Sequence, residues 1–164
     1  MRFVIAASEA SLKWGLGGPF AAAIFRLDNH QLVSAGVNLI INQGLSILHA
    51  EVVAIMRAQR LLGTYDLGDG KLPPMALVTS TEPCTMCLGA THWSGTSKVI
   101  SGATDADANS IGFDEGPKPD DWAKALRERG IEVKTEVLRG AAIDVLKKYQ
   151  TLGGNIYNSL RNTQ

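Results

Sequence analysis

The sequence predicts a three-layer α/β domain in which helices cover both faces of a mixed sheet. Strand-like apolar runs alternate with helix-like segments along the 164 residues, which is typical of this architecture. The first two predicted strands, residues 20–25 and 31–38, are separated only by a turn at 28–30. They should pair as an antiparallel hairpin, which makes the sheet mixed. Because the chain has the length of one domain, we expect a single domain over residues 1–164.

The N-terminal elements follow from apolar spacing and from glycine. The first predicted helix, residues 2–14, carries apolar residues on roughly one side: Phe3, Ile5, Ala6, Ala10 and Trp14. The Gly-rich stretch that follows should end this helix. After the hairpin, residues 50–62 predict a long apolar helix, and residues 63–74, rich in Gly and Asp, predict a loop. The polar residues of this helix should face outward: Arg57, Gln59 and Arg60.

The second half continues the alternation of strands and helices. Pro83 suits the first turn of a helix, where its missing N–H costs nothing. The predicted elements are, in order, a strand at 75–80, a helix at 84–93, a strand at 98–102, a helix at 120–129, a strand at 131–136 and a helix at 141–152.

The charge balance argues against a polyanionic partner. Sixteen Lys and Arg residues balance sixteen Asp and Glu residues, so the chain lacks the positive field that attracts nucleic acid. No apolar run reaches the roughly 18 residues of a membrane span, and the N-terminal segment is too polar for a signal peptide. We therefore expect a cytoplasmic protein that acts on a small molecule, without nucleic acid or membrane as a partner.

Two short motifs indicate a metal site: His49-Ala50-Glu51 and the segment PCTMC at 83–87. Cysteines three apart on a helical turn point their sulfurs the same way, and a helix N-terminus favours thiolates. Two sulfurs and one imidazole fill three positions of a tetrahedral Zn²⁺ and leave one for water. We predict one zinc per chain, bound by His49, Cys84 and Cys87.

Glu51 follows the histidine by two residues. A carboxylate beside a zinc-coordinated water can accept its proton and pass it on, so we predict Glu51 as the catalytic base. A structural zinc would need a fourth ligand, for which His30 and His92 are the candidates. A redox pair of cysteines would leave the His-x-Glu motif unexplained.

The H-x-E…P-C-x-x-C arrangement is the signature of zinc deaminases. The chain resembles the cytidine-deaminase-like superfamily, in the branch of bacterial guanine deaminases. The segments that carry the resemblance are GGPFAAAIF at 17–25, VN at 37–38, HAE at 49–51, VTSTEPCTMCLGATHWSG at 78–95, IGFDEGP at 111–117 and NIYN at 155–158. The resemblance implies a mixed, mostly five-stranded sheet and a homodimer.

The resemblance also implies polar residues that hold a base. Asn38 should contact it, since an amide both donates and accepts hydrogen bonds. Either Asp114 or Glu115 should face the edge of guanine that carries N1–H and the 2-amino group, since a carboxylate accepts from both donors. We favour Glu115, which joins Glu51 as a catalytic residue, and keep Asp114 as the alternative.

Aromatic side chains should supply flat walls for a flat base, and Phe113 is the leading candidate. The others are Phe20, Trp93 and Tyr157, whereas Phe25 is assigned to the core. Tyr157 lies on a C-terminal tail, about residues 153–164, that begins with two glycines. In this branch the tail can cap an active site, sometimes that of the partner.

The resulting hypothesis is a zinc hydrolase that converts guanine to xanthine and ammonia. The same chemistry would serve another amino-heterocycle: an aminotriazine such as ammeline, a cytosine-like base or a nucleoside. The loop at 42–48 is apolar where many relatives carry an Asp-Pro-Thr type of loop, which could alter the entrance or the preferred substrate. A tRNA adenosine deaminase would need a basic tail or groove. A zinc-stabilised binding module is the non-enzymatic alternative.

Overall fold

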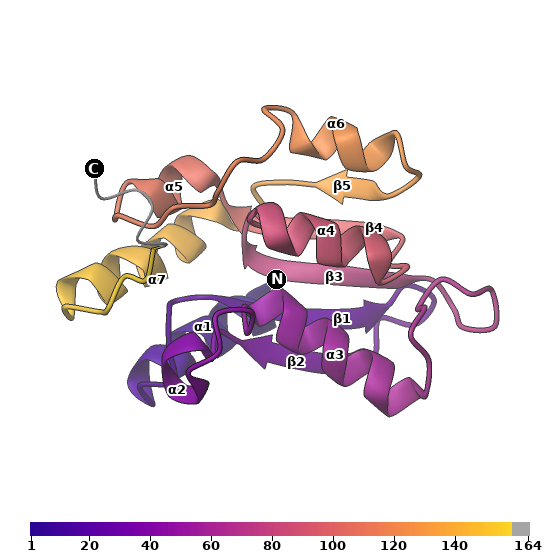
Figure 1. The fold of residues 1–164 in the computed structure, drawn as a ribbon, viewed down its shortest axis with the longest axis horizontal. Coiled ribbons are helices and arrows are strands. Elements are labelled where there is room, and N and C mark those ends of the chain that lie inside the picture. Colours follow the sequence, from indigo (N-terminus) through magenta and orange to yellow (C-terminus); the bar gives the residue numbers. More distant parts are fainter. Residues whose placement is uncertain (159–164) are drawn as a thin grey trace.

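The computed structural model describes residues 1–158 and contains a five-stranded sheet with the order β2-β1-β3-β4-β5 (Figure 1). The strands are Ala21–Arg26 (β1), Leu32–Val37 (β2), Met75–Thr81 (β3), Lys98–Ala103 (β4) and Glu132–Lys134 (β5). β1 pairs antiparallel with both β2 and β3, whereas β3, β4 and β5 run parallel. The predicted mixed sheet with its opening hairpin is confirmed.

Helices cover both faces of this sheet, which confirms the predicted three layers. They are Arg2–Lys13 (α1), Ile40–Gln43 (α2), Ala50–Leu62 (α3), Thr85–Trp93 (α4), Asp105–Asn109 (α5), Trp122–Arg127 (α6) and Arg139–Thr151 (α7). α3, α4 and α6 lie on one face, and α1 and α7 lie on the other (Figure 1). The short helices α2 and α5 were not predicted, because four or five residues are too few to show a helical period.

The core has an apolar cluster on each face of the sheet. Ile24 and Leu77 are fully buried against α3. Their neighbours Ala23 and Val78 point to the other face and pack with α1, where Phe25 also lies, as predicted. Because successive strand residues point to opposite faces, a strand buried on both sides is apolar throughout.

The apolar side predicted for the first helix is wrong. Val4, Ser8 and Ser11 face the sheet, whereas Trp14 is 72% exposed. The hydroxyl of Ser8 donates a hydrogen bond to the carbonyl oxygen of Pro19 over 2.6 Å. Small side chains let this helix approach the sheet closely, and the hydrogen bond satisfies the buried hydroxyl.

Gly36 on β2 allows α3 to begin directly against the sheet. A Cβ at this position would lie 2.5 Å from the backbone oxygen of Ala50, so no other residue permits the contact. The two residues that flank Ala50, His49 and Glu51, are therefore held at a fixed place over the sheet. Among residues 1–158, no helix has the length and apolar character needed to cross a membrane.

Candidate active site

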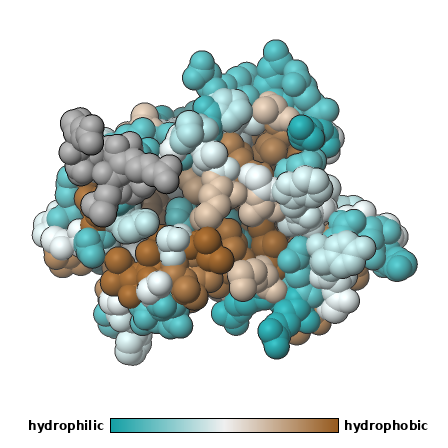
Figure 2. Space-filling view, in the orientation of Figure 1, coloured by the Kyte–Doolittle hydropathy of each residue, from teal (hydrophilic) through white to brown (hydrophobic). Residues whose placement is uncertain are grey.

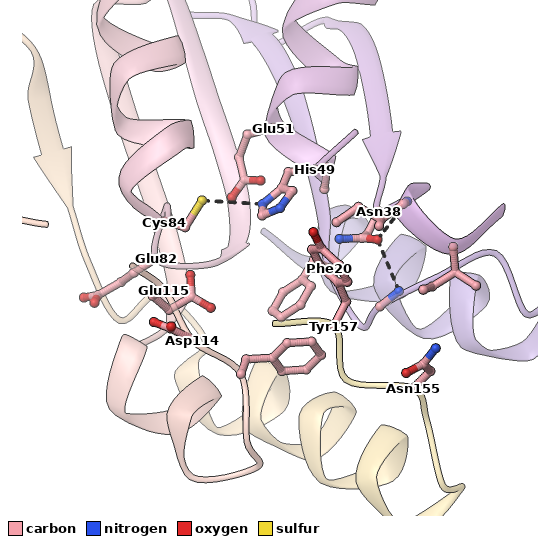
Figure 3. A pocket seen from close by; sticks show the side chains of 15 residues that line it. Phe20, Asn38, His49, Glu51, Glu82, Cys84, Asp114, Glu115, Asn155 and Tyr157 are labelled. Carbon is pink, nitrogen blue, oxygen red and sulfur yellow. Dashed lines mark hydrogen bonds between the residues drawn. The ribbon is translucent and has the colours of Figure 1, made fainter. Parts of the chain in front are cut away.

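A pocket opens where the N-terminal ends of α3 and α4 meet, beyond the carboxyl end of β3 (Figure 3). It is lined by Gly18, Phe20, Asn38, Ile40, Ile41, His49, Ala50, Glu51, Glu82, Cys84, Phe113, Asp114, Glu115, Asn155 and Tyr157. Segments distant in the sequence thus meet at one place. Of the residues predicted for the site, two are absent from this lining: Cys87, which is buried directly behind it, and Trp93.

His49, Cys84 and Cys87 form a group whose ligand atoms all lie within 4.8 Å of one another. The Nδ1 atom of His49 is 3.4 Å from the Sγ atom of Cys84. The number and kind of these donors match a catalytic zinc site with an open position, and the group could hold one metal ion. Within the described residues, neither His30 nor His92 belongs to this group.

The two thiols differ in their ionisation. The neighbouring Cys87 side chain and a hydrogen bond with His49 lower the pKa of the Cys84 thiol to about 4. Cys84 is therefore a thiolate at neutral pH, which is the form that binds a metal. The hydrogen bond to Cys84, together with burial, raises the pKa of Cys87. A cation bound here would displace the proton of Cys87, so metal binding should release a proton.

Glu51 is buried beside these donors and lies outside the metal-binding group. Its carboxylate accepts hydrogen bonds from the Thr79 hydroxyl at 2.9 Å and from the Cys87 thiol at 3.4 Å. Burial, reinforced by the charge of Cys84, raises its pKa. A carboxylate with a raised pKa and a fixed position is suited to take up a proton and give it back.

Asn38 presents a hydrogen-bond donor to the pocket. Its Oδ1 atom accepts the backbone N–H groups of Gly18, at 3.4 Å, and Ile40, at 3.2 Å. These bonds assign the orientation of the amide, because only the oxygen can accept them. The Nδ2 group is left to face the pocket (Figure 3).

The two candidate carboxylates lie in different surroundings. Asp114 is exposed, and its Oδ1 atom accepts the N–H of Gly116 at 2.9 Å, a contact within a turn. Glu115 is half-buried, and its carbonyl oxygen accepts the N–H of Thr85 at 3.0 Å. Burial, with the negative charge of Cys84, raises the pKa of Glu115 to about 8. Of the two carboxyl groups, Glu115 is the one more shielded from solvent.

Aromatic rings form the wall away from the metal-binding group (Figure 3). Phe20 and Phe113 meet edge to face with their centroids 4.8 Å apart, and Tyr157 lines the pocket beside them. Trp93 does not belong to this wall. It is 80% exposed, and its ring contacts His92 instead. Trp93 is absent from the lining of this pocket because α4 begins at the pocket and Trp93 stands at its far end, so its place in a substrate wall stays a prediction.

The described part of the C-terminal tail packs against the 112–114 loop and α7. The Nδ2 group of Asn158 donates to the carbonyl oxygen of Gly112 at 2.8 Å, and its Oδ1 atom accepts the N–H of Asp114 at 3.0 Å. The Tyr149 hydroxyl donates to the carbonyl oxygen of Asn155 at 2.6 Å. These contacts bring the tail to the pocket. Residues 159–164 of the predicted cap lie outside the described residues.

Sequence reasoning missed several lining residues. Glu82 adjoins the Pro-Cys motif, and Asn155 opens the segment NIYN, so both had a signal in the sequence. Ile40 and Ile41 belong to the unpredicted helix α2, just before the apolar loop expected to shape the entrance. The apolar character of that entrance therefore begins earlier than predicted.

Comparison with known proteins identifies the family. The guanine deaminase of Bacillus subtilis (strain 168) is 38% identical over 117 residues, which cover 71% of this chain and 70% of that relative. The solved structure of NE0047 in complex with 2,6-diaminopurine is 44% identical, with a TM-score of 0.90, and the match covers 96% of this chain and 82% of that one. A guanine deaminase from Nitrosomonas europaea is 43% identical, with a TM-score of 0.89, over 91% of this chain and 81% of that one.

The family model that matches spans the residues in which the metal-binding group was found. Residues 1–103 match the cytidine and deoxycytidylate deaminase zinc-binding region, and His49, Cys84 and Cys87 all lie within this range. The match covers more than half of the chain and agrees with the fold and with the donor set. The chain therefore belongs to the zinc-dependent cytidine and deoxycytidylate deaminase family.

Proposed function

We propose that this chain is a zinc-dependent guanine deaminase that converts guanine and water to xanthine and ammonia. The observation that carries the proposal is one pocket in which a zinc-type donor group faces both a fixed amide donor, Asn38, and a half-buried carboxyl group, Glu115. The similar guanine deaminases support this substrate. So does 2,6-diaminopurine, the ligand of a solved relative, because it carries an amino group at C2 as guanine does.

The reaction requires a proton to move from water to the departing amine. When bound at His49, Cys84 and Cys87, zinc lowers the pKa of a coordinated water toward 7. Glu51 is placed to accept the proton of the attacking water, because its buried carboxylate lies beside the donor group. A C–O bond then forms at C2 of guanine. Glu51 returns this proton to a ring nitrogen, then takes the proton of the new C2 hydroxyl and passes it to the amine nitrogen, so that the C2–N bond breaks, C2 becomes a carbonyl and the amine leaves as ammonia.

Recognition follows from the donors and acceptors on the two sides. Guanine presents N1–H and its 2-amino group side by side, and an ionised Glu115 can accept from both. Two donors stabilise the ionised form, so binding should lower the raised pKa of Glu115. The Nδ2 group of Asn38 donates to an acceptor elsewhere on the base. Adenine has an acceptor at N1 and would be repelled by the same carboxylate.

A panel of guanine, ammeline, cytosine and their nucleoside analogues, assayed by ammonia release, tests this proposal. Guanine should give the highest kcat/KM. Glu115→Gln should lower kcat/KM for guanine roughly 5–150-fold, because a mispaired polar group in the pocket costs about 1–3 kcal/mol. Asp114→Asn should have less effect. Preferred turnover of ammeline or cytosine, or Asp114→Asn as the more damaging change, would contradict the assignment.

We also propose that the tail caps the pocket and that Tyr157 forms part of the substrate wall. The support is its position in the lining and the pair of hydrogen bonds that Asn158 makes with the 112–114 loop. Tyr157→Ala should raise KM for guanine about 5-fold or more, from the loss of about 1 kcal/mol of stacking. Tyr65→Ala, at a residue that is 89% exposed, serves as the control. An unchanged KM in Tyr157→Ala would contradict the cap.

A homodimer is proposed from the apolar surface. Figure 2 shows hydrophobic residues gathered over α2 and beside α4, on the face that carries these helices. Exposed apolar side chains on and next to these helices and on α3 include Ile41, Leu45, Ile47, Met56, Met86 and Trp93. Large exposed apolar patches usually mark interfaces. Light scattering should give the mass of two chains, and Met56→Glu should shift it to one. A monomeric wild type would contradict the proposal.

We propose the cytoplasm as the compartment and free base, rather than nucleic acid, as the substrate. Two free cysteines in a metal-binding group need a reducing compartment, and the chain carries no net charge. Cell fractionation tests the first point. The second would be contradicted by deamination of tRNA at a rate comparable with that of guanine.

A further inference from the structure

A buried lysine lies behind the pocket, in contact with groups from three segments. The side chain of Lys118 is 8% exposed, and its Nζ donates to the carbonyl oxygen of Pro83 at 3.2 Å. It forms ion pairs with Glu82, at 3.8 Å, and with Asp105. It also lies 5.2 Å from the ring centroid of Trp122. The ammonium group is therefore held by one hydrogen bond, two ion pairs and the face of an aromatic ring.

The lysine belongs to the loop that carries Glu115. That loop is attached to the start of α4 at two points. The N–H of Thr85 donates to the carbonyl oxygen of Glu115 at 3.0 Å, and Nζ of Lys118 donates to Pro83. Pro83 and Thr85 are the two neighbours of Cys84. These two contacts therefore hold the loop beside Cys84, the residue that supplies a metal-binding sulfur.

We propose that Lys118 is a positioning residue for Glu115: its ammonium holds the 115–118 loop against the Pro83 carbonyl, next to the contact between Thr85 and Glu115, and so sets where the Glu115 carboxyl group stands in the pocket. This inference rests on the proposed function, in which Glu115 faces the substrate. Without the ammonium, of the two contacts at Pro83 and Thr85, the loop would keep only the second. The neighbouring carboxylates of Glu82 and Asp105 would also lose the positive charge that compensates them.

The charge of the lysine supports the same role. Burial is the main cause that raises the pKa of Glu115, and the negative charges nearby raise it further. The positive charge of Lys118 lowers this pKa and so favours the ionised form of Glu115. A salt bridge with partners this buried is sensitive to removal of one partner, because the other is left without compensation. The effect of Lys118 should therefore reach the substrate through Glu115 and not through the metal.

The test is a double-mutant cycle on the zinc-loaded enzyme. Lys118→Met should keep about one zinc per chain and lower kcat/KM for guanine by about 30-fold, the scale of a misplaced recognition group. In the Glu115→Gln background the same substitution should cost less than about 3-fold, since coupled residues are not additive. Lys124→Met is the matched control, because Lys124 is exposed and pairs only at 3.9 Å with Glu128. Equal losses in both backgrounds would overturn the proposal.

A second measurement does not depend on catalysis. The Thr85 amide, which donates to Glu115, should exchange its hydrogen at least about 10-fold faster in Lys118→Met than in Lys124→Met, as expected for local opening. If the single variant does not fold, the pair Lys118→Met with Asp105→Asn removes one uncompensated charge and should show the same exchange. Unchanged Thr85 exchange would overturn the positioning role. A wild type inactive on guanine, with faster Thr85 exchange in the variant, would instead refute only the proposed function.

Discussion

The orientation of the Asn38 amide makes a sharp prediction about substrate recognition. Asn38→Asp keeps the Oδ1 atom that accepts the N–H groups of Gly18 and Ile40, so the local backbone should be preserved. The pocket-facing NH₂ donor becomes an oxygen acceptor. Where guanine offers an acceptor, a hydrogen bond is lost and two acceptors oppose each other, at a cost of about 1–3 kcal/mol. This corresponds to roughly a 5–150-fold fall in kcat/KM.

Steady-state kinetics on guanine would be compared between Asn38→Asp and Asn42→Asp, the latter at an exposed position on α2 that introduces the same charge. Asn38→Ala serves as a third variant: it orphans two backbone N–H groups and should lower the free energy of unfolding by about 1–3 kcal/mol. If Asn38→Asp retains kcat/KM within about 3-fold of wild type, the amide does not donate to the substrate and the reasoning fails.

Three further outcomes are expected. Cys87→Ala should lose most of the zinc, measured by atomic emission, because two donors remain of a three-donor group; full retention would contradict the ligand assignment. Glu51→Gln should keep zinc and fold but lose at least about 100-fold in kcat, and near-normal turnover would exclude it from proton transfer. The hydrogen bonds from Arg139 lower the pKa of Asp107, so its stabilising effect is present above the unfolded value of about 3.9 and fades as pH falls. Asp107→Asn should therefore reduce unfolding free energy at pH 7, with the difference from wild type narrowing below about pH 4; Asp144→Asn, at an exposed position, is the control.

The sequence predicted the parts of the site that depend on short spacing. His49, Cys84 and Cys87 are set by two local motifs, and the structure brings them together because α3 and α4 begin at the same edge of the sheet. Trp93 lies outside the pocket lining of this chain, because nearness in sequence to the Cys motif does not determine which end of a helix faces the pocket.

Contacts between distant segments could not be read from the sequence. In the sequence, Lys118 is one charged residue in a polar loop, with nothing to mark it as buried. It is buried because the loop packs against Pro83, which lies 35 residues earlier in the chain. The short helices α2 and α5 were also not predicted, because neither is long enough to show an apolar period. A reciprocal cap between Thr104 and Asp107 stabilises α5 instead.

The positions of the metal donors make the ion a cross-link of the fold. His49 and Cys84 precede two different helices and are 35 residues apart in the chain. An ion that binds this pair in the folded chain, and only weakly in the unfolded chain, stabilises the fold by an amount that grows with free metal concentration. Chelation should therefore lower the melting temperature as well as the activity. In a cell short of zinc, the abundance of this enzyme would fall through turnover of the unfolded chain, which would couple its deaminase activity to metal supply.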